Sequence, residues 1–69
     1  ERRVKRDIVK IGEDSDGLGW YNFRYVWDAN SAPLNTGTMV DEVERLRPWA
    51  LGPVINGIKT VDYSKLEAR

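Results

Sequence analysis

Hydrophobic and polar residues alternate most clearly in one stretch of the chain. In residues 20–28 (WYNFRYVWD), aromatic side chains occupy every second position: Tyr21, Phe23, Tyr25 and Trp27. Alternation with a period of two, in residue types that favour extended backbone, predicts a β-strand with one buried face. We expect this aromatic face to supply much of the hydrophobic core.

The residues before this strand allow two interpretations. Val4, Ile8 and Ile11 recur with the spacing of one helical face. Val9 interrupts that period, so the same stretch can equally be extended. Residues 13–19 are mostly polar and contain an Asp-Gly pair, which predicts a loop between this stretch and the strand.

The boundaries of one helix follow from its end residues. Asp41 is followed three residues later by Glu44, an acidic capping box that predicts an N-cap at Asp41. Pro48 ends the helix near Arg47, because a proline disfavours the helical conformation in the residue before it. The apolar positions of this segment fall on one stripe, and they are Val40, Val43 and Leu46.

Three further segments surround this helix. Residues 36–40 (TGTMV) predict a short strand in front of it. Asn56-Gly57 predicts a two-residue hairpin turn, because both central positions of such a turn need positive φ. Residues 54–55 and 58–63 should therefore pair as strands, and the closing segment YSKLEAR should begin a helix.

The order of these elements predicts a single α+β domain, residues 1–69, with a small antiparallel sheet and short helices. A core of this size is marginal on its own. Cysteine and histidine are absent, which excludes disulfides, thiolate metal sites and histidine bases. Oligomerisation or a longer parent chain is the expected source of stability. A first residue other than Met fits a fragment or a product released from something longer.

Charge limits the classes of partner. Lys plus Arg equals Asp plus Glu at 11 each, so the formal net charge is zero. A dedicated nucleic-acid binder is not expected, because its affinity depends on neutralising phosphates. No apolar run is long enough to span a membrane, and the acidic residues lack a calcium-loop spacing, so we expect no membrane, metal or cofactor. The nucleic-acid alternative would use Arg2, Arg3, Arg6, Trp20 and Tyr21.

Four cations lie within the first six residues, and Lys5 is the one with candidate chemistry. A lysine acts as a general base when its amine is neutral, which requires burial or neighbouring positive charge. Arg2, Arg3 and Arg6 supply that charge. Taken alone, the run is more typical of a solvated basic segment.

Three stretches taken together resemble a known family. RRVKRDIVKIG, YNFRYVWD…TGTMVDEVERLRPWA and NGIKTVDYSKL occur in this order and cover nearly the whole chain. They are similar to the C-terminal intramolecular chaperone auto-processing domain of phage tail spikes and tail fibres, of the endosialidase type. The same domain type occurs in the myelin regulatory factor of animals. That family's pattern runs Ser-Asp-x-Arg-Leu-Lys-x-x-Ile, then Phe-x-Tyr, then Gly-Val-Met-Ala-x-Glu-Val with Arg-Pro, and Gly-Tyr-x-x-Val-Asp-Tyr-x-x-Leu. Each piece is weak alone, whereas the ordered set is specific.

The resemblance places Lys5 on the family's catalytic lysine. The other matched positions are Arg3, Val4, Ile8, Gly37, Met39, Glu42, Val43, Val61, Asp62, Tyr63 and Leu66. Two departures matter. Glu1 falls on the family's aspartate, so the family's serine would lie immediately before Glu1, outside this sequence. Val40 and Asp41 replace the usual alanine and glutamine.

The resemblance implies a one-use chaperone that forms an intertwined homotrimer, helps three fibre chains fold in register and then cuts itself off. The serine would attack the peptide bond before it with Lys5 as general base, in a Ser/Lys dyad without a cofactor. Arg2, Arg3 and Arg6 would keep Lys5 deprotonable or pair with acids of adjacent chains. The implied partners are two further copies and the upstream fibre domain of the precursor. The implied location is the host cytoplasm during phage assembly, with the domain then released from or attached to the virion tail.

Glu42 and Asp62 are expected to be structural, as caps or as partners of these arginines. Trp49 and Tyr63 are expected in the core or in a trimer interface. One alternative keeps the same fold and partners: a non-cleaving trimerisation module whose residue before Glu1 is not serine. Another, a small enzyme with a diffusible substrate, has no obvious site in the sequence.

Overall fold

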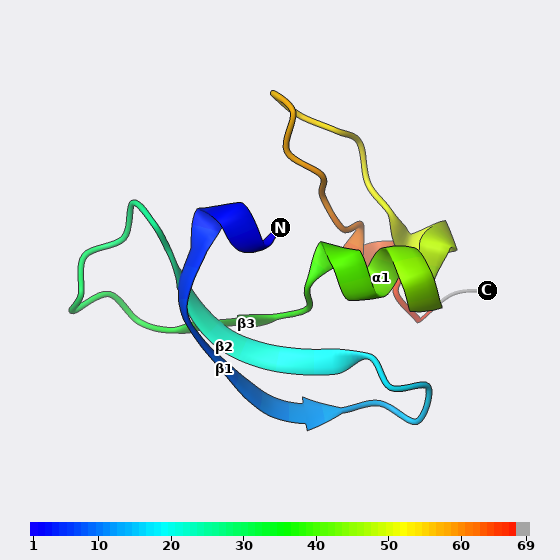
Figure 1. Cartoon of the computed structure of the whole chain (residues 1–69), viewed down its shortest axis with the longest axis horizontal. Coiled ribbons are helices and arrows are strands. Elements are labelled where there is room, and N and C mark those ends of the chain that lie inside the picture. Colours follow the sequence, from blue (N-terminus) through cyan, green and yellow to red (C-terminus); the bar gives the residue numbers. More distant parts are fainter. Residues whose placement is uncertain (68–69) are drawn as a thin grey trace.

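A three-stranded antiparallel sheet forms one layer of the computed structural model, which describes residues 1–67 (Figure 1). β1 (Lys5–Glu13) pairs with β2 (Gly19–Tyr25), which pairs in turn with β3 (Asn35–Gly37). The central strand is therefore the aromatic one predicted from the alternating pattern. The predicted α+β class is confirmed, because the sheet is joined by one α-helix and short 3-10 turns.

A single 3-10 turn, η1 (Arg2–Val4), lies at the start of the chain, and the extended strand β1 follows it. Asp7 has a φ of 54°, and the pairing of β1 with β2 shifts register between Arg6 and Val9. This bulge explains why the apolar residues of β1 do not alternate: an extra residue moves the following side chains out of step.

The helix α1 (Val40–Leu46) buries the predicted apolar stripe. Val40 and Val43 lie in the core, and Leu46 packs against it. Pro48 follows the helix and begins a separate 3-10 turn, η2 (Pro48–Ala50), so its predicted stop is confirmed.

The predicted capping box is wrong. Met39 is the N-cap of α1 and makes no side-chain cap hydrogen bond, so Asp41 already lies in the first helical turn. The Asp41 carboxylate accepts a hydrogen bond from Arg2 Nε at 3.3 Å instead. Glu44 pairs with Lys59 Nζ at 3.1 Å. Both carboxylates of the expected capping box therefore bind cations distant in sequence and not the helix N-terminus.

Two groups of buried side chains form the core. The first contains Leu18, Val43, Ala50 and Leu66. The second contains Tyr21, Phe23 and Met39. The aromatic face of β2 is thus only partly buried: the strand ends at Tyr25, and Trp27 lies in the following turn with 68% of its surface exposed. The expectation that Trp27 belongs to the core is wrong.

Residues 51–61 form an arm that projects away from the sheet (Figure 1). At its tip, Asn56 and Gly57 have φ values of 50° and 76°, which confirms the predicted turn. The continuous strands predicted on either side of it are wrong, because isolated bridges join only Leu51 to Val61 and Ile55 to Ile58. In the part of the chain that the structure describes, no third strand lies beside the arm to extend the pairing.

The end of the chain is held by a turn and by an arginine. A single 3-10 turn, η3 (Tyr63–Lys65), replaces the helix expected in YSKLEAR, whose residues 68–69 lie outside the described part. The Arg47 side chain, only 13% exposed, donates to the Leu66 carbonyl at 3.1 Å. It also pairs with Asp14 at 2.8 Å and Asp16 at 2.9 Å, which ties the loop before β2 to the C-terminal segment.

Replacing Leu18 should test the first core group. Leu18 is fully buried, so Leu18→Ala removes packed methyl groups and should lower the free energy of unfolding by about 2–5 kcal/mol. Leu34→Ala is the matched control, because Leu34 is 49% exposed and its truncation leaves no cavity. Urea unfolding of both variants measures the difference, and equal destabilisation would contradict the assignment of Leu18 to the core.

The Arg47 pair predicts a dependence of stability on pH. The hydrogen bond from Arg47 lowers the pKa of Asp16 from 3.8 to about 2. A carboxyl whose pKa is lower in the folded protein stabilises the fold above its unfolded pKa and loses this effect as pH falls from about 4 to 2. Asp16→Asn should therefore be less stable than the parent chain at pH 6 and equally stable near pH 2. Because the pKa of Glu1 is also about 2, the readout is the difference between the two proteins at each pH.

Candidate active-site cleft around Lys5

A cleft of about 330 Å³ opens beside the predicted catalytic lysine. Its wall includes Glu1 and Lys5 from the start of the chain, Tyr25 and Trp27 from the end of β2, and Tyr63 from η3. Residues of the arm complete the lining. Segments distant in sequence therefore meet around one amine.

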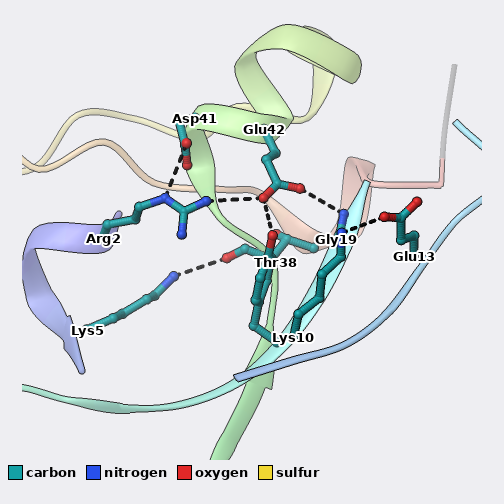
Figure 2. A network of polar contacts seen from close by, with 9 residues as sticks. Arg2, Lys5, Lys10, Glu13, Gly19, Thr38, Asp41 and Glu42 are labelled. Atoms are coloured by element: carbon teal, nitrogen blue, oxygen red, sulfur yellow. Dashed lines mark hydrogen bonds and ion pairs between the residues drawn. The ribbon is translucent and has the colours of Figure 1, made fainter. Parts of the chain in front are cut away.

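The Lys5 ammonium lies over an aromatic ring and against a backbone carbonyl. Its Nζ is 4.5 Å from the centroid of the Phe23 ring. The same nitrogen donates a hydrogen bond to the Thr38 carbonyl at 3.1 Å (Figure 2). Among residues 1–67, no carboxylate forms an ion pair with Lys5. Lys10, five positions along the same strand, is by contrast paired with Glu13.

The acceptor of Lys5 is held in place by the motif residue Tyr63. Thr38 is fully buried between β3 and α1. Its backbone N–H donates to the Tyr63 hydroxyl at 3.0 Å, and its side-chain hydroxyl lies 3.4 Å from the same oxygen. Gly37 makes this approach possible, because a Cβ at that position would lie 2.5 Å from the Tyr63 hydroxyl. Asp62 accepts hydrogen bonds from the backbone and side chain of Ser64, which fixes the turn that carries Tyr63.

Glu42 joins α1 to both the sheet and the N-terminal turn. One carboxylate oxygen accepts from the Gly19 backbone N–H at 2.8 Å, and the other accepts from the Tyr21 hydroxyl. Arg2 donates to the second oxygen at 3.2 Å (Figure 2). Glu42 therefore has the expected role of an arginine partner. Asp62 has the other expected role, because its side chain caps the 3-10 turn η3.

The three neighbouring arginines are occupied by acceptors of their own chain. Arg2 pairs with Asp41 and Glu42. Arg3 pairs with Glu1 and donates to the Gly57 carbonyl at 3.2 Å. Arg6 pairs with Asp7 at 2.5 Å and donates to the Asp28 carbonyl. Together they hold the N-terminal segment against the body and the arm, while Lys5 is the cation of this group without a carboxylate partner in residues 1–67.

Glu1 is anchored with its amino nitrogen toward Lys5. Hydrogen bonds from Arg3 and from the Lys59 backbone N–H lower the pKa of the Glu1 carboxyl to about 2. Burial first, and then the positive charge of Lys5, lower the pKa of the Glu1 amino group to about 6. The backbone nitrogen of Glu1 therefore lies close to the Lys5 amine, and both residues line the cleft.

A second cleft, of about 500 Å³, lies beside Arg47 and Trp49. Its acids Asp14 and Asp16 are bound to Arg47, and residues 1–67 contain no group of three or more possible metal ligands. Trp49 is partly exposed and Tyr63 is half exposed, so neither lies in the core of the single chain, and the expected place of both in a trimer interface stays a prediction. No helix in residues 1–67 has the length and apolar character that a membrane span requires.

Three residues of the Lys5 site were not identified from the sequence. Phe23 was assigned to the core alone, Trp27 likewise, and Thr38 was not singled out. The signal for Phe23 and Trp27 was present in the alternating aromatic pattern, but which of these rings lies beside an amine depends on tertiary packing. Thr38 contributes a backbone carbonyl. Every residue has this group, so the residue type gives no signal for it.

Tyr63→Phe should loosen the contact that holds Thr38. Without the hydroxyl, the buried Thr38 N–H loses its acceptor, which should cost about 1–3 kcal/mol of unfolding free energy. Tyr25→Phe is the matched control: among the described residues its hydroxyl has no hydrogen-bond partner, and it lines the same cleft. Amide hydrogen exchange at Thr38 should accelerate in the first variant and not in the second. Equal protection of Thr38 in both variants would exclude the role given to the Tyr63 hydroxyl.

Comparison of the chain with protein-family models, with curated proteins and with solved structures finds no match in any of the three.

Proposed function

We propose that this chain is an intramolecular chaperone domain of a phage tail fibre or spike, released from its precursor by autoproteolysis through Lys5 and a serine immediately before Glu1. The observation that carries the proposal is the position of Lys5. Its amine lies in a cleft beside the backbone nitrogen of Glu1 and has no carboxylate partner among residues 1–67. The motif residues Gly37 and Tyr63 hold the carbonyl that orients this amine.

The contacts of Lys5 suit a general base. A neutral lysine has two N–H groups and one lone pair. One N–H donates to the Thr38 carbonyl and fixes the nitrogen, which leaves the lone pair to accept a proton. Within residues 1–67 no carboxylate competes with the serine hydroxyl for this amine.

The proposed reaction has two steps. Lys5 takes the proton of the serine hydroxyl, and the serine oxygen bonds to the carbonyl carbon of the preceding residue. The C–N bond then breaks, and the amino group of the serine receives the proton from Lys5. Water hydrolyses the resulting ester in the second step, which frees the upstream chain and leaves a domain that begins with the serine.

Assembly is the other half of the proposal, and exposed apolar side chains support it. Val54 and Ile55 at the tip of the arm and Val9 on β1 are more than half exposed in a domain with few buried residues. Exposed apolar groups on a small domain are typical of surfaces that become buried in an assembly. The proposed partners are two further copies of the chain and the upstream fibre domain. The proposed location is the host cytoplasm during phage assembly, before the domain leaves or stays on the virion tail.

One observation favours the second candidate, a trimerisation module that does not cleave. The Phe23 ring and the Thr38 carbonyl both attract a positive charge, so the same contacts fit a purely structural, charged Lys5. In that case Lys5 would only join β1 to the connection between β3 and α1.

Substitution of Lys5 in the full-length precursor separates the two candidates. Lys5→Ala and Lys5→Arg should both leave the precursor uncut, because neither side chain offers a base near neutral pH. Lys10→Ala is the matched control: Lys10 lies on the same strand, is exposed and pairs with Glu13, so cleavage should proceed as in the parent. Gel electrophoresis measures cleavage, and sedimentation measures the oligomeric state of each variant.

Normal release of the domain from the Lys5→Arg precursor would remove Lys5 from the reaction. A parent precursor that forms trimers but is never cut would favour the non-cleaving module. A parent that is cut only when Lys5 is present would establish the dyad.

A further inference from the structure

The wall of the Lys5 cleft carries a pair of stacked aromatic rings. The rings of Tyr25 and Trp27 lie 4.9 Å apart between centroids, with an angle of 2° between their planes. Trp27 is nevertheless 68% exposed, so most of this large apolar side chain faces solvent beside the cleft. The Lys5 amine and the exposed Trp27 ring line the same cleft, so a ligand bound there would cover this apolar surface.

The direction of the chain at the cleft is fixed by Glu1. Its carboxylate is held by Arg3 and by the Lys59 backbone N–H. Its amino nitrogen lies beside Lys5. A residue bonded to that nitrogen therefore starts inside the cleft, and the residue before it is about 7 Å from Glu1 in an extended chain.

We propose that this cleft is the binding subsite for the peptide on the acyl side of the cleaved bond, and that the residue there is apolar or aromatic and packs on the Tyr25–Trp27 stack. The inference rests on the proposed function, whose substrate it specifies. It makes Trp27 a residue that determines specificity and positions the substrate carbonyl, while Lys5 performs the proton transfer.

The chemistry of the cleft favours an apolar occupant over a charged one. Val4, Ile58 and Val61 line it together with the aromatic rings. Lys59 is paired with Glu44, so its ammonium is already compensated. An acidic occupant would pair with Lys5 and hold it in the charged form, which would oppose its action as a base. Aromatic pairs in offset-stacked or edge-to-face arrangements contribute attraction beyond the area they bury, so a further aromatic side chain on Trp27 would be favoured.

The experiment measures release of the domain from the full-length precursor over time. Trp27→Ala should slow release at least tenfold, and Trp27→Phe should restore most of the rate, because a flat ring remains. Trp49→Ala is the matched control: it removes an indole from the other cleft and should leave the rate within about twofold of the parent. Circular dichroism confirms that each variant is folded. In the parent precursor, replacing the acyl-side residue with Gly should slow release, and replacing it with Phe should not.

The outcomes distinguish this inference from the proposed function. If the parent is cut and Trp27→Ala is cut at the same rate, the subsite is wrong while the dyad stands. If the parent is never cut, the dyad fails, and the subsite is tested by titrating the 69-residue chain with acetyl-Phe-Ser-amide and acetyl-Gly-Ser-amide. A shift of the Trp27 indole NMR signal with the Phe peptide alone supports the subsite. Equal shifts with both peptides, or none, overturn it.

Discussion

Thr38 holds together three parts of the chain that are far apart in sequence. Its N–H and side-chain hydroxyl face Tyr63 from the C-terminal turn, and its carbonyl accepts from Lys5 at the start of β1. Because Thr38 is fully buried, water cannot replace these partners. The position of Lys5 is therefore fixed by a hydrogen-bonded segment that joins the sheet to the helix.

The carboxylate of Glu42, in the first turn of α1, complements this arrangement. It binds the first residue of β2, the ring hydroxyl of Tyr21 and the guanidinium of Arg2. The N-terminal turn is thus attached to the body through Arg2, and to the arm through Glu1 and Arg3. In a domain with a small apolar core, such polar contacts fix how the segments are arranged, because each contact requires a specific geometry. They thereby position the cleft.

Local patterns predicted the elements whose stability is local. The alternation in β2, the apolar stripe of α1, the stop at Pro48 and the Asn56-Gly57 turn all follow from backbone preferences and face periodicity. The bulge at Asp7 and the N-cap at Met39 do not follow from local patterns. Asp7 and Asp41 pair with arginines that are distant in sequence, and a local pattern does not show such partners.

The site shows the same division. Lys5 was identified as a candidate from the charge of its neighbours and the family resemblance, yet those neighbours are engaged elsewhere. The ring under Lys5, its carbonyl acceptor and the exposed Trp27 depend on how β2, β3 and η3 meet. Sequence reasoning therefore identified the amine, and only the fold defined its surroundings.

The left-handed conformation of Asp7 has a consequence for how the molecule behaves in a crowded solution. β1 is a nine-residue strand at the edge of the sheet, and such edges offer unpaired backbone groups to other chains. The bulge interrupts that row between Arg6 and Val9, and the Asp7 carboxylate pairs there with Arg6 and Arg24. A foreign strand could match only a few consecutive residues before meeting a kink and a cluster of charge. The bulge at Asp7 interrupts the alternating pattern by which a strand is recognised in a sequence. The same bulge opposes edge-to-edge aggregation of the domain.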